Sequence, residues 1–538
     1  MMAENIKVLT TSLIVFLGHP IWVSRRTNCY LCGMFIRRKP NKSGTVSIQV
    51  VDKRGGRYVV VKSFGASRDD PELVRMESEA SHYIDTYGGQ LTLDFQASTP
   101  EERLRQIVGG IKGIRQNGVQ LLLEPVYDAI GFNRIGDSLL RQLVIARVAQ
   151  PRSKLATVDY LRRYFDAHTT SDNIYRYMDK LYNTQRELVQ QISVEHTRKV
   201  LGGRLGIVFY DVTTLYFETA REDALRSPGF SKDGKTAESQ VVLGLLVSEG
   251  GYPLSYSLFN GKQYEGHTMI PVIDDFVRRF SLTDFIVVAD TGLLTRRNIT
   301  LLKVAGYRFI LGGRVRKESA PVQDWVLSLP KDPERLYERR INGDERIIVS
   351  YSEKRAEKDA YNRERGIRRL RKAYSAGKIR KENINQRGYN KFLRIEKDIA
   401  VSIDEARVIE DAQWDGLKAY ITNTDLAPRE VVNQYHGLWV VERAFRIAKG
   451  TLETRPVFHF TERRIEAHIC ICFIAYKVYK EFERQLLLKG IGLSVDKVLD
   501  IAKTVSTVTI DVGSNQTMSK TLLLTDEQRI LEPLLPPT

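Results

Sequence analysis

The sequence contains little cysteine. Four of its 538 residues are cysteine, too few for a disulfide framework in a chain of this length, so a reducing, cytoplasmic compartment is expected. A structural zinc site needs two close ligand pairs. The CxxC of Cys29 and Cys32 has only Cys470 and Cys472 to complete it, and those two lie in an apolar helical pattern. The cysteines therefore favour neither disulfides nor zinc.

Long apolar segments are also missing. The N-terminal stretch 8–23 is shorter than the roughly 20 residues that span a bilayer, and it contains His19 and Pro20. It has no basic leader and no clear small-residue cleavage site, so we do not expect a signal peptide. No unit of roughly 20–50 residues repeats, which excludes a solenoid. Residues 1–33 are expected to be an extension outside the fold.

Acidic residues are the other shortage. The chain has 65 Asp and Glu against 82 Lys and Arg, a net charge of +17, which favours a polyanionic partner, either nucleic acid or an anionic membrane. Hydrophobic residues make up 42% and charged residues 27%. This ordinary globular usage excludes wholesale disorder, collagen and a multi-span membrane protein. At roughly 150 residues per domain, the length predicts three or four domains.

More than half of the net charge lies in one segment. Residues 353–397 hold 16 Lys and Arg and six Asp and Glu, a net +10. Aromatic residues interrupt this basic run, namely Tyr361, Tyr374, Tyr389 and Phe392. Solvated helices often carry charge runs, but a single-signed run with aromatic residues is typical of phosphate contact with occasional base stacking. The localised charge therefore favours nucleic acid over a membrane.

Residues 34–195 predict a β-hairpin followed by a mainly helical, DNA-binding region. The strand-like runs 45–51 and 57–64 flank a Gly-containing turn, and a helix at 70–86 precedes mostly helical spacing. Two short helices meet at the break 150–153, as in a helix-turn-helix that reads DNA. Ordinary packing with a solvated basic face is the alternative. Basic residues flank the break: Arg141, Arg147, Arg152, Lys154, Arg162 and Arg163.

Apolar, β-rich runs begin near residue 204. Three expected strands come first, followed by helix, strand, helix and strand, which implies an α/β fold with a mixed sheet and at least one parallel crossover. The strands are expected at 205–217, 239–248, 252–260, 285–290 and 307–314, and the helices at 269–280 and 295–305.

Four segments complete the expected organisation. Residues 200–315 form the first part of the core and 426–490 the second part. Between them, 316–425 form a β-rich basic insertion, and 491–538 form a C-terminal tail. Strands of the insertion are expected near 347–351, 398–402 and 418–422.

Three acidic residues stand out by position. Asp211 follows the apolar run IVFY and Asp290 ends the run FIVVA, where an unpaired carboxylate is costly. Glu442 lies on a helix expected over 431–453. Each has an ordinary explanation: a hydrogen-bonded structural aspartate, a helix cap, and an i,i+4 partner of Arg446, respectively.

Together the three carboxylates predict more than each does alone. Two aspartates at strand ends and a glutamate on a helix beside the sheet bring hard oxygen ligands to one place. Such ligands suit Mg²⁺ or Mn²⁺. Two such ions activate a water or a 3′-hydroxyl and stabilise the leaving oxygen of a phosphoryl displacement. The expected substrate is a phosphodiester.

The glutamate helix has two stripes. Its apolar stripe, expected to pack on the sheet, consists of Val441, Ala444, Phe445, Ala448 and Leu452. The neighbouring stripe consists of Tyr435, Glu442, Arg446 and Lys449. It places a phenol and two cations beside the glutamate, as suits a metal ligand flanked by phosphate-binding groups. Surface ion pairing is the alternative for the cations.

This helix resembles that of the DDE transposases of bacterial insertion sequences, in the insertion-sequence-four-like branch with a Y-x2-R-x3-E-x6-K signature. Tyr435, Glu442 and Lys449 match its spacing. Leu438 stands at the arginine position, which leaves Arg443 or Arg446 to compensate. The stretches 209–218, 287–299 and 442–459 resemble this family too, and the resemblance runs from about residue 34 to about 485.

The resemblance implies an RNase H-like catalytic core with three catalytic, metal-binding residues and three DNA-binding residues. The first set is Asp211, Asp290 and Glu442, holding two Mg²⁺ or Mn²⁺ ions, and the second is Tyr435, Arg446 and Lys449. The β-rich insertion accounts for the 152 positions from Asp290 to Glu442. In related transposases this insertion contacts the transposon end and helps to stabilise a DNA hairpin by stacking a flipped base on an aromatic side chain. Trp325 and Trp414 are the candidates, with core packing as the alternative.

The expected function is Mg-dependent cleavage and strand transfer at the terminal inverted repeats of an insertion sequence. The expected partner is double-stranded DNA, both transposon ends and target, with a homodimer in the synaptic complex, no membrane partner, and a cytoplasmic, nucleoid-associated location in a bacterium. The alternatives are a non-catalytic DNA-binding protein derived from a transposase and an RNase H-like endonuclease.

Three remaining side chains leave two interpretations open. Glu265 and His267 follow the third expected strand and either reach the metal site or DNA, or have a structural role, which we favour. His459 is similar. A buried helix over 463–486 accounts for Cys470 and Cys472.

Overall fold

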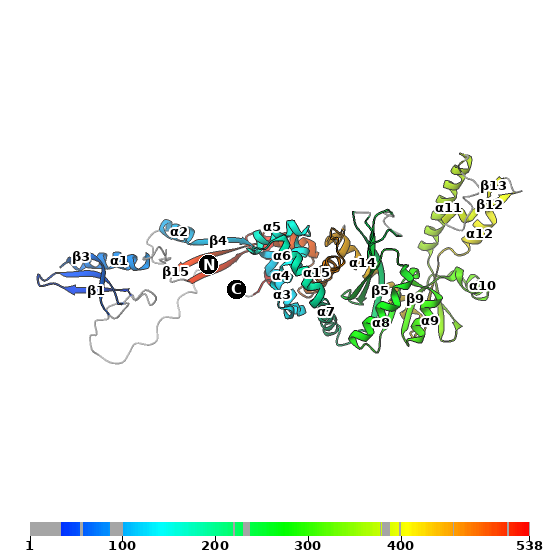
Figure 1. The fold of residues 1–538 in the computed structure, drawn as a ribbon, viewed down its shortest axis with the longest axis horizontal. Helices are drawn as coiled ribbons and strands as arrows, with labels where there is room; N and C mark the ends of the chain where they lie inside the picture. The colour runs from blue at the N-terminus through cyan, green and yellow to red at the C-terminus, as the bar shows by residue number, and fades with distance from the viewer. Residues whose placement is uncertain are drawn as a thin grey trace, which may run out of the picture. The chain divides into compact units, whose positions relative to one another are not determined.

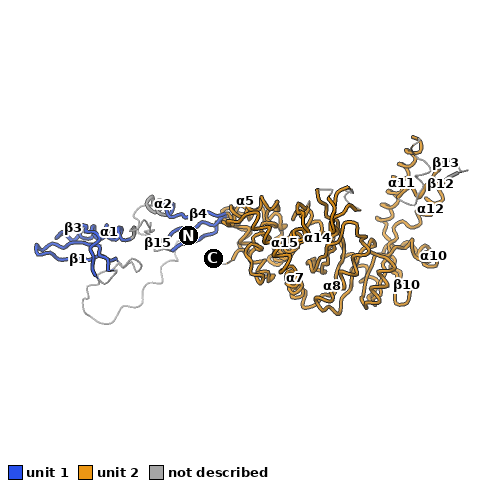
Figure 2. Tube along the Cα trace, viewed as in Figure 1, with its two compact units in different colours: residues 1–115, 506–522 blue, residues 116–505, 523–538 orange. Residues whose placement is uncertain are grey.

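The computed structural model divides the chain into two compact units. One comprises residues 1–115 and 506–522, and the other 116–505 and 523–538 (Figure 2). The structure describes residues 34–53, 57–86, 100–218, 221–229, 237–376, 378, 388–396, 400–455, 457–513 and 516–536. The expected extension 1–33, with Cys29 and Cys32, lies outside the described residues. Within the described ranges, no helix is both long and apolar enough to cross a membrane.

The first unit contains a three-stranded antiparallel sheet covered by one helix. Its elements are β1 (Met34–Pro40), β2 (Val46–Asp52), β3 (Val59–Ser67) and α1 (Asp70–Thr86). Ile48 and Val50 of β2 pack against Leu73 and Ala80 of α1 in a small apolar core. The predicted hairpin is confirmed as β2 and β3, and the predicted helix as α1.

A second sheet of this unit joins distant parts of the chain. Helix α2 (Pro100–Gly109) precedes β4 (Ile111–Gln116), which pairs with β15 (Ser506–Gly513), and β15 pairs with β16 (Gln516–Leu522). The amide of Asp511 donates to the carbonyl of Gly110 at 2.8 Å. The segment expected as a C-terminal tail thus contributes two strands.

The second unit begins with a helical region. Its helices are α3 (Gly118–Ile130), α4 (Ser138–Ala149), α5 (Lys154–Phe165), α6 (Ser171–Lys180) and α7 (Arg186–Val200), joined by α15 (Glu462–Leu488), α16 (Val495–Ala502) and α17 (Asp526–Arg529). Helix α15 packs against α3, α4, α6 and α7 and buries Cys470 and Cys472, as predicted. The break at 150–153 is confirmed between α4 and α5. Arg147 and Lys154 beside it are buried at 6% exposure, so neither belongs to a solvated face.

An eight-stranded sheet forms the centre of this unit, in the order β10-β11-β14-β9-β8-β5-β6-β7. Five strands come from the first part of the core: β5 (Ile207–Tyr216), β6 (Gln240–Ser248), β7 (Pro253–Asn260), β8 (Ile286–Ala289) and β9 (Arg308–Gly313). Strands β5, β6 and β7 are antiparallel neighbours, whereas β8 is parallel to β5 and β9 is parallel to β8. The predicted mixed sheet with a parallel crossover is confirmed.

Helices cover both faces of this sheet. Helices α8 (Met269–Phe280) and α9 (Arg296–Val304) bury their apolar residues on the face of Val208 and Tyr210. Helices α13 (Pro428–His436) and α14 (Trp439–Arg446) pack on the opposite face, that of Phe209, and α14 lies beside β5 (Figure 1). Because successive side chains of a strand point to opposite faces, the continuous apolar run of β5 serves both layers.

The insertion extends the central sheet. Its strands β10 (Tyr337–Asn342), β11 (Glu345–Tyr351) and β14 (Leu417–Thr422) join the edge next to β9. The remaining elements are α10 (Ala320–Ser328), α11 (Glu353–Ser375), β12 (Leu393–Glu396), β13 (Ala400–Ile403) and α12 (Glu405–Ala412). Most of the basic segment is thus the 23-residue helix α11, which begins directly after β11.

Candidate active site

The sheet places Asp211 and Asp290 side by side. The parallel register of β5 and β8 pairs Tyr210 with Ala289, so the two aspartates occupy the next position on neighbouring strands. The backbone of Asp290 is still extended, with φ −76° and ψ 161°. Since side chains alternate between faces, both aspartates share the face of Phe209, which α13 and α14 cover.

Asp211 and Asp290 have different surroundings. Asp211 is half-buried, and its Oδ1 accepts a hydrogen bond from the amide of Val212 at 2.8 Å. Asp290 is exposed, and its Oδ1 accepts from the hydroxyl of Tyr435 at 2.6 Å. Helix α9 is capped by Thr295, whose Oγ1 accepts from the amide of Asn298. A capping role on α9 therefore does not account for Asp290.

Glu442 is carried over this face by a broken helix. Helix α13 ends at His436 and α14 begins at Trp439, with Gly437 in the junction. A Cβ at Gly437 would lie 2.5 Å from Cζ of Phe209, so glycine lets the junction press against β5 two residues before Asp211. Helix α14 then packs on β5 and β6. Its buried side holds Val441, Ala444 and Phe445, and Glu442 is exposed.

Lys418 of β14 links Asp290 and Glu442 electrostatically. Burial lowers the pKa of Lys418 below its ordinary value and Arg355 lowers it further, while the carboxylates of Asp290 and Glu442 oppose this effect. Both carboxylates therefore act on one ammonium group. The Nζ of Lys418 also lies 4.4 Å from the ring centre of Tyr435, the residue that donates to Asp290, as cation–π contacts require.

Tyr435 is a buried hydrogen-bond donor. Its side chain is 4% exposed and its ring lies against that of Tyr420, with centroids 4.9 Å apart. Burial, and then the hydrogen bond to Asp290, raise the pKa of Tyr435 well above its usual value. The hydroxyl therefore keeps its proton and remains a donor to Asp290. This tyrosine, predicted to contact DNA, lies where it orients a carboxylate.

Gly312 of β9 and Arg314, which directly follows this strand, hold the loop after Asp290 in place. Arg314 donates from Nη2 to the carbonyls of Thr291 and Gly292, at 2.8 and 3.1 Å. Gly312 leaves space for the loop and for Tyr435, because a Cβ there would collide with Thr291 Oγ1 and Tyr435 Oη. Asp290 is thus held from both sides.

Substituting Gly312 with Ala is expected to destabilise this unit by about 1–3 kcal/mol, since the extra carbon forces Thr291 and Tyr435 apart in a packed site. Urea unfolding followed by fluorescence measures the change. Gly206→Ala is the matched control, because a Cβ at Gly206 meets nothing within 4 Å. An unfolding midpoint for Gly312→Ala equal to that of the control would contradict the packing described here.

The three carboxylates match a hard divalent cation in donor chemistry. Asp211, Asp290 and Glu442 lie on or over one face of the sheet, and two of them are exposed. Within the described ranges, however, no group of three His, Cys, Asp or Glu side chains is placed closely enough to hold a metal ion. The donor types fit Mg²⁺ or Mn²⁺, and in this arrangement Asp290 accepts a hydrogen bond from Tyr435.

The other residues of the signature have distinct positions. Arg446, at the end of α14, is exposed, and Lys449 is half-buried in a π-helical turn, Ile447–Thr451. Leu438 is 7% exposed and belongs to the apolar core below the helix. The leucine therefore contributes packing where the signature has arginine. Arg443 pairs with Glu483, whereas Arg446 is exposed.

The three remaining candidates are Glu265, His267 and His459. Glu265 lies beside the Asp290 loop, since a Cβ at Gly292 would be 3.9 Å from its Oε2. His267 is exposed and contacts the ring of Tyr264. His459 is buried beside His468, and burial lowers its pKa to about 3. A neutral, buried imidazole of this kind supports the structural interpretation.

Trp325 and Trp414 both pack at the edge of a small apolar core of the insertion. Arg339 lies over Trp325 and Arg316 lies over Trp414, with 5.7 and 5.8 Å from the guanidinium carbon to the ring centre. Both rings are half-buried. Core packing therefore accounts for part of each ring.

Sequence reasoning missed Lys418, Gly312 and Arg314. Lys418 stands in an alternating strand pattern, LKAYIT, where a lysine normally faces solvent. Its role depends on the pairing of β14 with β9, which no local signal specifies. The pair Gly312-Gly313 at the end of an apolar strand was the one usable signal, since glycine in a strand often marks a close backbone approach.

Residues 202–477 match the family described as Transposase DDE domain, which is more than half of the 538 residues. The search of curated protein sequences gives no match.

Solved structures that match the chain include the piggyBac transposase synaptic complex with hairpin DNA, with 9% identity, a TM-score of 0.37, and coverage of 72% of this chain and 76% of that one. The Mos1 transposase paired-end complex with left transposon end has 10% identity, a TM-score of 0.15, and coverage of 31% and 56%. The Mos1 mariner paired end complex with Mn has 12% identity, a TM-score of 0.14, and coverage of 32% and 56%. The assignment rests on the sequence match: this chain belongs to the Transposase DDE domain family.

Proposed function

We propose that this chain is the transposase of an insertion sequence, in the insertion-sequence-four-like branch with the Y-R-E-K signature. It binds the terminal inverted repeats of its element, cleaves DNA at the ends and joins the 3′-hydroxyls to target DNA. One observation carries the proposal. Within the family match, the register of β5 and β8 sets Asp211 beside Asp290 on the face that α14 covers with Glu442.

The fold supports an RNase H-like core. Strands β5, β6 and β7 form an antiparallel meander, and β8 and β9 follow as parallel strands on the other side of β5. This arrangement puts Asp290, which directly follows β8, beside Asp211 in the middle of β5. The helical region α3–α7 and the basic insertion are then the DNA-binding parts of the enzyme.

Asp211, Asp290 and Glu442 are the proposed ligands of two Mg²⁺ or Mn²⁺ ions. Bound there, the ions would supply Lewis-acid activation of a water or a 3′-hydroxyl and stabilisation of the leaving oxygen. Tyr435 orients Asp290 through its hydroxyl. Arg446, exposed one turn after Glu442, contacts a DNA phosphate, and Lys449 follows on the same side of the helix.

The proposed partners are the two transposon ends and the target duplex. Because both ends are joined in one event, we propose a homodimer in the synaptic complex. A cytoplasmic, nucleoid-associated location in a bacterium follows from a DNA substrate and from the low cysteine content.

Purified protein with DNA carrying the element's ends tests this function. Cleavage at the repeat boundary and strand transfer are expected with Mg²⁺ or Mn²⁺ and are lost with EDTA, since the carboxylates alone repel the phosphodiester. Imperfect inverted repeats that bracket the gene, flanked by short direct repeats, are expected in the genome. Binding without cutting would instead indicate a non-catalytic DNA-binding protein, and cutting without strand transfer an endonuclease.

A further inference from the structure

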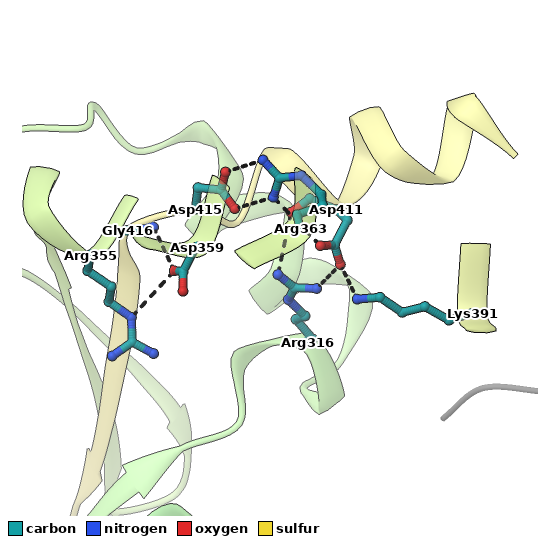
Figure 3. Close-up of polar contacts among 8 residues, drawn as sticks. All are labelled: Arg316, Arg355, Asp359, Arg363, Lys391, Asp411, Asp415 and Gly416. Atoms are coloured by element: carbon teal, nitrogen blue, oxygen red, sulfur yellow. Dashed lines mark hydrogen bonds and ion pairs between the residues drawn. The ribbon is translucent and has the colours of Figure 1, made fainter. Parts of the chain in front are cut away.

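Two basic cavities share Arg355 and Asp359 as lining residues. The larger, of 640 Å³, is lined by α11, the segment after β9 and the end of α12. Ion pairs join three of its cations, Arg316, Arg363 and Lys391, to Asp411 or Asp415 (Figure 3). Its charged lining residues are Arg314, Arg316, Lys317, Arg355, Arg363 and Lys391 against Asp359, Asp411 and Asp415. Arg363 forms two hydrogen bonds to Asp415, both 2.5 Å long, and Arg316 and Lys391 both bond Asp411. All three carboxylates of this cavity are thus engaged in ion pairs, and its formal net charge is about +3.

The second cavity, of 630 Å³, has a single carboxylate in its lining. We call it the α11–β14 groove, and its charged lining residues are Lys354, Arg355, Lys358, Lys418 and Arg429 against the single carboxylate of Asp359. His436 also lines it, and burial, together with Lys418, lowers the pKa of that imidazole below its ordinary value. The histidine is therefore neutral near pH 7, and the groove carries a net charge of about +4 at that pH.

The one carboxylate of the groove is already engaged. Asp359 Oδ2 accepts from the amide of Gly416 at 3.3 Å and lies 3.7 Å from Nε of Arg355. Figure 3 shows this pair set apart from the Arg363 and Asp411 network. In the described part of the chain, neither Lys354 nor Lys358 has a carboxylate partner, and both are exposed. One turn apart on α11, they present their ammonium groups on one face.

The groove leads to the catalytic carboxylates. Lys418 lines it, lies against the ring of Tyr435, and is acted on by the charges of Asp290 and Glu442. Tyr420 and His436, on β14 and α13, line the same groove. A chain of phosphates bound along Lys354 and Lys358 would therefore be continuous with the site through Lys418.

We propose that the α11–β14 groove binds the phosphodiester backbone of the DNA strand that is cut. Lys354 and Lys358 contact phosphates along the strand, and Lys418 contacts the phosphate nearest to Asp290 and Glu442. Lys418 is thus a positioning residue that offsets the repulsion between the carboxylates and the strand. The inference rests on the proposed function, because it assumes a DNA substrate, but it concerns the path of the strand.

Salt dependence of DNA binding tests the groove without any cleavage. The probe is a fluorescent duplex of mixed sequence with one single-stranded end, titrated with the full chain in EDTA at several salt concentrations. Each lost phosphate contact lowers the slope of log K against log salt by about one. Lys354→Gln with Lys358→Gln is expected to lower the slope by about two, and Lys418→Gln by about one. Lys418→Arg keeps the charge and is expected to restore the slope.

Arg368→Gln with Lys372→Gln is the matched control. These residues are exposed on α11, one turn apart, and line neither cavity, so the pair removes the same charge from the same helix and is expected to leave the slope nearly unchanged. An equal fall in the control, or an unchanged slope in the groove variants, overturns the proposed path while DNA binding stands. If the unaltered chain does not bind the probe, the proposed function fails together with the groove.

Discussion

Asp290→Asn is expected to abolish DNA cleavage while leaving end binding within a few-fold of the unaltered protein. The substitution keeps the size of the side chain but removes the charge that would hold a divalent ion, so the loss of rate is expected to be on the order of 10³-fold or more. Asp290 is exposed, so the asparagine variant is not expected to disturb folding. Cleavage is measured on DNA carrying the element's ends with Mg²⁺, and binding is measured in EDTA.

Asp284→Asn provides a matched control for this experiment. Asp284 lies just before β8, at the opposite end from Asp290, is 79% exposed on its side chain, and pairs with Arg308. Its loss is expected to leave cleavage intact. Tyr435→Phe removes the donor to Asp290 and is expected to reduce cleavage less than Asp290→Asn, since it alters only the orientation of the carboxylate. Full cleavage by Asp290→Asn would exclude the proposed set of three carboxylates.

Arg363→Met is expected to give the largest loss of stability, about 3 kcal/mol. The guanidinium of Arg363 and the carboxylate of Asp415 are each 11% exposed, and Asp415 would be left as a buried charge with its bidentate partner gone. Urea unfolding followed by tryptophan fluorescence reports the change, because Trp414 directly precedes Asp415. The fraction of native signal at a given urea concentration is the quantity to compare between variants.

Arg371→Met is the control for this test, because it also removes one arginine from an ion pair, but from an exposed one. Arg371 lies on the same helix and pairs with Glu405, but the two side chains are 61% and 60% exposed, so a cost of only about 0–1 kcal/mol is expected. Adding Asp415→Asn to Arg363→Met is expected to recover part of the loss, since no buried charge then remains. Equal losses in Arg363→Met and Arg371→Met would show that burial of the pair contributes nothing.

The layers of the central sheet could be predicted because buried strands leave a local signal. Strands β5 to β9 coincide with apolar, β-branched runs, and α8 covers the whole of the helix predicted at 269–280. The attachment of β10, β11 and β14 to the same sheet could not be predicted, because β11 and β14 pair residues about 70 positions apart. Pairing at that separation depends on the assembled edge of β9 and on no local pattern.

The glutamate helix shows where a periodic pattern is insufficient. The apolar stripe of 431–453 is confirmed at Val441, Ala444 and Phe445, yet the helix is interrupted at Gly437. The ring of Phe209, on a different strand, occupies the space of a Cβ at that position, so the junction accommodates glycine there. Asp211, Asp290 and Glu442 could therefore be identified as candidates from the sequence. The contact of Phe209 with the α13–α14 junction and the position of the Lys418 ammonium group could not, because both depend on tertiary structure.

The pairing of β4 with β15 bears on how the chain folds as it is made. Strand β4 ends at Gln116 and its partner begins at Ser506. At roughly 5–20 residues per second, a ribosome needs roughly 20–80 seconds to cover that interval. Throughout this time β4, whose side chains are exposed even in the finished sheet, lacks this neighbour. A nascent chain therefore holds an open strand edge until the last part of synthesis, the situation in which chaperones and premature strand pairing compete.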